Sequence, residues 1–385
     1  MTHPLPGRVR ERDDACPGAL QTHVAADGAL ARVRVPGGAL SAGQLHVLAG
    51  AARDLGDGAL ELTSRGNVQL RGLAPGSEPE LGERLAEGGL LPSATHERVR
   101  NVVASTLSGR SGGLIDVRPW VRAFDRGLCA DPALAALPGR FLATLDDGRS
   151  DVSGLAGDVG LHAVAPDSVA LLLAGADSNL RVHPGEAVAL LLAAAGAFLA
   201  ERDAQGGSAW RLAELTDGPL RVARRLGATA PPSPGPAPAT VPPVGAVPQD
   251  DGRTAHVAAV PLGRLTAEVA GLFAELAADV QVTPWRSVVV PDQDGDAVVD
   301  RLTGAGLVLD PRSPWHRVTA CAGRPGCARS LADVRGDVTR AVADGILPAG
   351  GARQHWAGCA RRCGRPAGDV IDIVATGTGY RTTRS

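Results

Sequence analysis

The stretch VPGGALSA, Val35–Ala42, returns later in the chain as VPLGRLTA, Val260–Ala267. Before each copy stands a short apolar strand pattern, ARVRV or AHVAAV, and after each copy comes an apolar pattern with helical spacing. Ser41 and Thr266 stand where the N-cap of that helix is expected. A second strand pattern follows in both places, ALELTSRGNVQLRG in the first and VQVTPWRSVVVP in the second. The order β-α-β therefore occurs twice, which predicts an internal duplication.

A segment rich in Pro, Ala and Gly divides the two copies. It reads PPSPGPAPATVPPVGAVPQDDG, Pro231 to Gly252, and carries almost no charge. Such a composition is typical of a stiff, extended linker. Between the first copy and this linker, strand patterns alternate with helical patterns at about 116–130 and 185–202. The sequence therefore predicts a mixed α and β protein of several domains.

The composition excludes some classes of protein. The chain has 385 residues, of which 44% are hydrophobic and 21% charged, so a buried core is expected. A formal net charge of −2 argues against a general nucleic-acid binder. The polar start of the chain lacks an apolar signal region, and the longest apolar run, Ala187–Ala200, is too short to span a membrane. We therefore expect a cytoplasmic protein, whose cysteines are ligands or free thiols rather than disulfides.

Four of the six cysteines form two close pairs. Cys321 and Cys327 lie in CAGRPGC, and Cys359 and Cys363 lie in CARRC. One [4Fe–4S] cluster takes four thiolates, and residues four apart on a helix share one face. A zinc site, two disulfides and unrelated buried cysteines are the alternatives, and C-x5-C fits a zinc knuckle poorly. The pattern favours a [4Fe–4S] cluster held by these four residues.

The remaining two cysteines stand apart. Cys129, in RGLCADP, is expected to be a packed or free thiol. Cys16, in DACPGAL, precedes a Pro-Gly turn, and it is either structural or close to a site.

The cysteine spacing, together with TSRGNVQLRG on a duplicated β-α-β frame, resembles the sirohaem-dependent sulfite and nitrite reductase superfamily. Within it, stretches such as RNVVASTLSG, LIDVRPWVRAF and HWAGCARRCGRP resemble the precorrin-3B synthase branch. The resemblance implies an α+β fold with two ferredoxin-like half-domains and two α/β units around a central [4Fe–4S] and tetrapyrrole site. The implied division is 16–88 and 255–312 for the half-domains, 89–228 and 313–385 for the α/β units, and 229–254 for the linker.

The same resemblance implies an activity. In the synthase branch the tetrapyrrole is the substrate: precorrin-3A is hydroxylated with O2 and a ring acetate closes to a lactone, in aerobic cobalamin biosynthesis. In the reductases the last cysteine of C-x3-C, here Cys363, also links to sirohaem. The dioxygen chemistry leaves room for a mononuclear non-haem iron, but no ligands and no catalytic residue can be assigned. No G-x-G-x-x-G follows a predicted strand, so we expect a ferredoxin or a separate NAD(P)H-dependent reductase to supply electrons.

Arginines are the expected partners of the substrate's acetate and propionate groups, because guanidinium matches carboxylate geometry. Arg65, Gln69 and Arg71 alternate along a predicted strand and would share a face, which either binds substrate or faces solvent. Other basic stretches match segments that line the reductase pocket. The predicted substrate-binding set is Arg65, Gln69, Arg71, Arg100, Asn101, Arg140 and Arg211.

Three further arginines are weaker candidates for binding the substrate's carboxylates. Arg286 matches Arg65 across the repeat, in the half that is degenerate in the superfamily. Arg32 and Arg34 share a face and either line a solvated edge or reach carboxylates.

Two alternatives to the monooxygenase remain open. The first is a sirohaem sulfite or nitrite reductase. The chain contains no lysine, and Gly66 stands where reductases usually carry Gln; both departures disfavour reduction of a small oxyanion. The second alternative is a non-catalytic tetrapyrrole-binding iron–sulfur protein, which the arginines alone do not separate from an enzyme.

Overall fold

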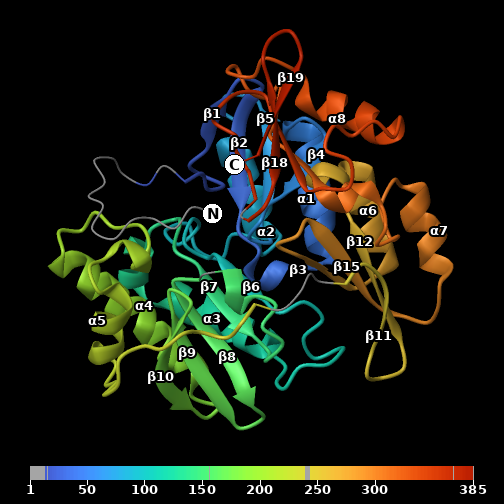
Figure 1. Ribbon diagram of the computed structural model, residues 1–385. Helices are drawn as coiled ribbons and strands as arrows, with labels where there is room; N and C mark the ends of the chain where they lie inside the picture. The colour runs from blue at the N-terminus through green and yellow to red at the C-terminus, as the bar shows by residue number, and fades with distance from the viewer. Residues whose placement is uncertain (1–13, 15, 156, 239–242, 367, 385) are drawn as a thin grey trace.

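The computed structural model describes residues 14, 16–155, 157–238, 243–366 and 368–384. Four β-sheets, most of them covered by helices, make up the molecule (Figure 1). The α+β class and the internal duplication predicted from the sequence are confirmed by these sheets. Among the described residues, every helix is too short or too polar to cross a lipid bilayer.

The first β-α-β copy supplies two helices and four of the five strands of one sheet. Its helix α1 begins after Ser41, whose hydroxyl accepts a hydrogen bond from the backbone N–H of Gln44 while the Gln44 side chain returns one to Ser41. This capping box explains why the helix starts at that residue. The elements are β1 (His23–Ala25), β2 (Gly28–Val33), β3 (Ala39–Ser41), α1 (Ala42–Leu55), β4 (Ala59–Leu62), β5 (Val68–Leu73) and α2 (Glu78–Glu87).

The second copy repeats this arrangement. Thr266 caps its helix α6 by accepting a hydrogen bond from the backbone N–H of Val269. Helices α1 and α6 pack against each other, and the buried side chains of both copies form one core. The elements are β11 (Gly245–Pro248), β12 (Thr254–Ala259), β13 (Arg264–Thr266), α6 (Ala267–Leu276), β14 (Asp279–Val282), β15 (Ser287–Gln293) and α7 (Ala297–Gly304).

The two copies exchange a strand. The first sheet has the order β1-β2-β5-β4-β13, so its last strand belongs to the second copy. The second sheet has the order β11-β12-β15-β14-β3, and its last strand belongs to the first copy. Leu265 pairs with Leu60, and Leu40 pairs with Val280. The quoted repeats VPGGALSA and VPLGRLTA thus contain the exchanged strands, which join the halves about a pseudo-twofold axis.

The residues between the first copy and the linker form a separate α/β unit, drawn in green in Figure 1. Its sheet has the order β10-β9-β8-β7-β6, with β6, β7 and β8 parallel. A second core fills the space between this sheet and its helices. The elements are β6 (Val102–Ala104), α3 (Arg118–Ala130), β7 (Ala143–Asp146), β8 (Val159–Ala165), β9 (Ser168–Leu173), β10 (Ala176–Val182), α4 (Ala187–Ala204) and α5 (Gly218–Arg225).

The C-terminal sheet carries the cysteine pairs. Strands β16, β17 and β18 are parallel, and β19 pairs with β18 in antiparallel fashion. Helix α8 packs on β16 and β17. In Figure 1 this red sheet lies beside the blue first copy. The elements are β16 (Val318–Ala320), α8 (Val334–Ala343), β17 (Gln354–Ala357), β18 (Ile371–Ala375) and β19 (Tyr380–Arg384).

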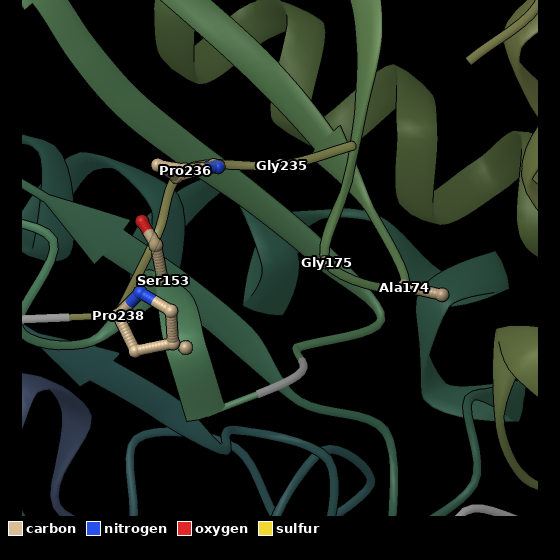
Figure 2. Close-up of a pocket in the computed structure, with 7 residues that line it drawn as sticks. Ser153, Ala174, Gly175, Gly235, Pro236 and Pro238 are labelled. Atoms are coloured by element: carbon tan, nitrogen blue, oxygen red, sulfur yellow. The ribbon is translucent and has the colours of Figure 1, made fainter. Parts of the chain in front are cut away.

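The linker runs along the first α/β unit. Ser233 forms a backbone bridge with Asp177, and the approach is close enough that a side chain on Gly235 would meet the Gly175 carbonyl. Its last residues form β11, and residues 239–242 lie outside the described part of the chain. A shallow hollow forms where this segment crosses the sheet, lined by Ser153, Gly154, Ala174, Gly175, Gly235, Pro236 and Pro238 (Figure 2).

Gly38 directly precedes the exchanged strand β3, at a point where the backbone leaves no room for a side chain. Its replacement therefore tests the strand exchange. It has φ +72°, and a Cβ there would stand 1.8 Å from the Val282 carbonyl oxygen at the end of β14. Gly58 has a similar φ of +76° but no atom within 4 Å of such a Cβ. We expect Gly58→Ala to lower the free energy of unfolding by about 1 kcal/mol, and Gly38→Ala by about 3 kcal/mol or more because backbone must also move. Urea unfolding of both variants measures this; equal losses would contradict it.

Candidate functional site

The four cysteines converge at one edge of the C-terminal sheet. Cys321 directly follows β16, and Cys359 follows β17, which lies parallel to it. Parallel neighbours end at the same edge, so the two loops meet there. The Cys321 N–H donates to the Trp356 carbonyl (2.9 Å), and the Gly358 N–H donates to the Cys321 sulfur (3.2 Å). The sheet topology thus brings together two pairs that are distant in sequence.

The sulfur atoms are near one another but not in a tight group. Burial raises the pKa of the Cys363 thiol, and the thiols of Cys359, Cys321 and Cys327 raise it further. No three of these sulfur atoms lie within 4.8 Å of one another. A tetrahedral zinc ion with Zn–S bonds of about 2.3 Å would need sulfur atoms about 3.8 Å apart. The four thiols therefore lie near one another without forming the compact set that a single tetrahedral zinc ion requires.

The C-x3-C segment differs from the sequence-based expectation. Its cysteines were expected on one face of a helix, but Cys359–Cys363 lies in turns, with Arg362 at φ +49° and Gly364 at +81°. Left-handed residues interrupt any helix. The expectation that these two cysteines lie on a helix is therefore wrong. The Cys363 thiol is nevertheless close enough to Cys359, Cys321 and Cys327 for their charges to act on it.

A second group of charged side chains gathers around Cys16. Arg32 and Arg34 at the end of β2 share the face predicted for them, and the expectation of a solvated edge is wrong for Arg34, which is 2% exposed. Burial lowers the pKa of Arg34 to about 9, and the neighbouring charge of Arg32 adds to this, so its guanidinium is still charged at neutral pH. Two of its nitrogens donate to the Arg98 and Pro17 carbonyls, but its third nitrogen, Nη1, is buried without a partner among the described residues.

Arg65 joins this group from a turn. The alternation had placed it on the strand with Gln69 and Arg71, but β5 starts at Val68, and Arg65 lies in a turn closed by Thr63 and Asn67. Burial and then the charge of Arg211 lower the pKa of Arg65 to about 10. Within the described residues its side chain makes no hydrogen bond or ion pair.

Arg140 and Arg211 stand on the neighbouring α/β unit. The Arg140 guanidinium lies 5.3 Å from the Trp210 ring centre, in an exposed position, and its charge acts on Cys16 and Arg32. Arg211 Nε donates to both oxygens of Asp158 at 2.9 and 2.7 Å. The group of Arg32, Arg34, Arg65 and Arg140, called the arginine cluster below, therefore surrounds Cys16 with more cations than carboxylates.

The other predicted substrate ligands are engaged within the protein. Arg100 makes a two-pronged ion pair with Asp125 at 2.7 and 2.8 Å, and it is 4% exposed. Asn101 is buried and bonds to the Asn67 amide and the Gly139 carbonyl. Both side-chain N–H groups of Asn101 and all three nitrogens of Arg100 therefore already bind oxygen atoms of the protein. The structure thus does not bring them to the arginine cluster as free groups.

Gln69 and Arg71 connect the first sheet to its surroundings. The Gln69 side-chain oxygen accepts from Arg32 Nε (2.9 Å), and its nitrogen donates to Glu61 (3.4 Å). Arg71 pairs with Asp27 and also donates to the Gly326 carbonyl (2.7 Å), beside Cys327. Arg71 therefore contacts the cysteine loop rather than a solvent-facing site.

The equivalence of Arg286 and Arg65 is shifted by one residue. The Arg286 N–H donates to the Thr283 carbonyl, just as the Gly66 N–H donates to the Thr63 carbonyl. Both residues have positive φ, +59° and +67°. Arg286 therefore corresponds to Gly66. The sequence analysis did not single out Asp372, because an isolated carboxylate in an apolar strand forms no motif.

The hollow of Figure 2 is separate from these groups, because none of the predicted site residues lines it.

Comparisons with known proteins show what the chain is similar to. Residues 23–88 match the nitrite/sulfite reductase ferredoxin-like half domain. A precorrin-3B synthase of Sinorhizobium sp is 26% identical over 96% of this chain and 82% of its own length. The ferredoxin–nitrite reductase of Synechococcus elongatus is 34% identical, but over only 32% of this chain and 25% of that protein.

Among solved structures, the Mycobacterium tuberculosis NirA protein superposes with a TM-score of 0.71 over 92% of this chain and 73% of that one, at 22% identity. This likeness concerns the fold. Residues 23–88 thus resemble a nitrite/sulfite reductase half domain, while the similarity that extends over almost the whole chain is to a precorrin-3B synthase.

Proposed function

We propose that this chain is a precorrin-3B synthase-type monooxygenase that binds one [4Fe–4S] cluster through Cys321, Cys327, Cys359 and Cys363. The observation that carries the proposal is the meeting of the two cysteine loops at one sheet edge, where Cys359, Cys321 and Cys327 all act on the Cys363 thiol. Similarity to a precorrin-3B synthase over 96% of the chain supports the choice of reaction. When bound, the cluster supplies one-electron transfer.

The arginine cluster is the proposed binding site for the substrate's carboxylates. Arg34 keeps one buried nitrogen without a partner, and Arg65 has no ion pair among the described residues. A carboxylate bound there would replace these missing partners, which makes binding of a polyanionic tetrapyrrole favourable. Precorrin-3A, with its acetate and propionate groups, fits this requirement. In the proposed reaction one oxygen atom of O2 enters the substrate, the other leaves as water, and the electrons come from an external donor.

The loops that carry the cysteines offer a place for that donor. Arg324, Arg329 and Arg361 are exposed on these loops, and in the described part of the chain none of them pairs with a carboxylate. Leu331, beside them, is 47% exposed. A positive surface with an apolar centre suits a small acidic electron carrier. We propose a ferredoxin, since the relative from Synechococcus is named for that donor.

The cluster assignment is tested by iron and acid-labile sulfide analysis of anaerobically purified protein. Cys363→Ser should lose most of the iron and all turnover of precorrin-3A with O2, whereas Cys129→Ser should keep both. Zinc instead of iron would contradict the proposal, as would loss of iron in Cys129→Ser. A stoichiometric sirohaem spectrum would favour a reductase, and tetrapyrrole binding without oxygen consumption would favour a carrier.

Replacing single arginines tests the substrate site. We expect Arg65→Gln to weaken binding of uroporphyrin III by on the order of 10-fold or more, because a charged hydrogen bond contributes about 1.5–3 kcal/mol. Its stability should hardly change, since no ion pair is lost. Arg100→Gln should instead cost about 3–5 kcal/mol of unfolding free energy, because Asp125 loses its buried partner. Fluorescence titration and urea unfolding measure both; the reverse pattern would refute these roles.

Charge reversal on the cysteine loops tests the donor site. Arg329→Glu should slow reduction of the cluster by a [2Fe–2S] ferredoxin on the order of 10-fold at low ionic strength, with a smaller effect at high salt. Arg53→Glu, an exposed position at the end of α1, serves as the control and should keep the wild-type rate. Dithionite should reduce all three proteins alike. Equal rates with ferredoxin in stopped-flow measurements would exclude this surface.

A further inference from the structure

Asp372 is a wholly buried carboxylate behind the Cys359–Cys363 loop. It lies on β18, and its side chain has no exposed surface. Arg362 Nη1 approaches its Oδ2 at 3.0 Å, and Arg365 Nε donates to its Oδ1 at 2.9 Å. Both arginines belong to the segment around Cys363, one directly before it and the other two residues after. One buried acid therefore holds the loop on both sides of the fourth thiol.

A buried imidazole lies beside Asp372 on the neighbouring strand. His355 is the register partner of Asp372 on β17 and is also fully buried. Its Nδ1 lies 3.0 Å from the Thr319 hydroxyl. Asp372 forms its ion pairs with the two loop arginines.

Further bonds fix the returning chain after Cys363. Arg365 also donates to the carbonyls of Pro366 and Val370 at 3.1 Å each. Arg362 itself adopts φ +49°, a conformation that costs about 1 kcal/mol and persists only where the surroundings impose it. The loop has no helix or strand of its own to hold it. Its shape therefore depends on the pairing with Asp372.

We propose that Asp372 is a positioning residue for the cluster: through Arg362 and Arg365 it holds the loop in the shape that presents Cys363 as a ligand. The inference rests on the proposed [4Fe–4S] cluster. Without the carboxylate, Arg362 and Arg365 lose the anion that both of them contact, and the repulsion between their charges opens the loop. The carboxylate also acts on the cluster as a fixed negative charge, while the arginines act with the opposite sign.

The test compares Asp372→Asn and Arg362→Gln with the wild type. Each protein is reconstituted with iron and sulfide, and the rate of cluster loss to a ferrous chelator is followed by visible absorption. We expect loss at least on the order of 10-fold faster in Asp372→Asn and a smaller acceleration in Arg362→Gln, as expected when a supporting partner of a ligand is removed. Redox titration adds a second readout: the midpoint potential should rise in Asp372→Asn and fall in Arg362→Gln.

Asp125→Asn is the matched control, because it breaks another buried Asp–Arg pair far from the cysteines in sequence. It should lower thermal stability without accelerating cluster loss. If both loop variants lose the cluster at the wild-type rate and keep the wild-type midpoint potential, the role of Asp372 is refuted while the proposed function stands. Failure of the wild type to take up a cluster would overturn the proposed function as well. If Asp372→Asn does not fold, Arg362→Gln, whose side chain is 35% exposed, decides the outcome.

Discussion

Each ferredoxin-like sheet needs one strand from the other copy to be complete, and the arrangement of the two copies depends on this exchange. Strand β13 closes the sheet of the first copy, and β3 closes the sheet of the second. The exchange sets the tight turns at Gly66 and Arg286 in equivalent places. It thereby holds Arg65 at the start of β5, near Arg34 at the end of β2. Strand pairing thus positions Arg34 and Arg65 of the arginine cluster, whereas Arg140 lies in a turn of the neighbouring α/β unit.

The C-terminal sheet is joined to this frame by charged groups. Arg335 on α8 contacts Glu61 of β4 at 2.6 Å, and Arg71 of β5 donates to the carbonyl beside Cys327. Gln69 lies between Glu61 and Arg32, so a continuous set of polar contacts runs from the arginine cluster to the cysteine domain. Polar residues on β5 therefore serve the assembly of the domains. We propose that a ligand meets Arg65 and Arg34, which keeps one buried nitrogen without a partner among the described residues.

The sequence was sufficient to predict the duplication, the helix starts at Ser41 and Thr266, and the class of fold, because these depend on local patterns. It was less informative where tertiary contacts decide. Arg100 and Asn101 looked like ligands, but Asp125 and Asn67, distant in sequence, take up their donors. Arg34 looked half-solvated because a strand pattern does not reveal what covers it. Asp372 belongs to no sequence motif, because its role depends on contacts with a loop that follows the neighbouring strand.

The strand exchange also determines when the protein can fold during synthesis. Residues up to Leu73 supply four strands of the first sheet, yet its edge at β4 stays unpaired until Arg264–Thr266 has left the ribosome. An exposed edge of this kind is open to pairing with other chains. The sheet of the first α/β unit contains only β6 to β10, so it can form before the later part of the chain is synthesised. We therefore expect the middle of the nascent chain to become structured before its beginning.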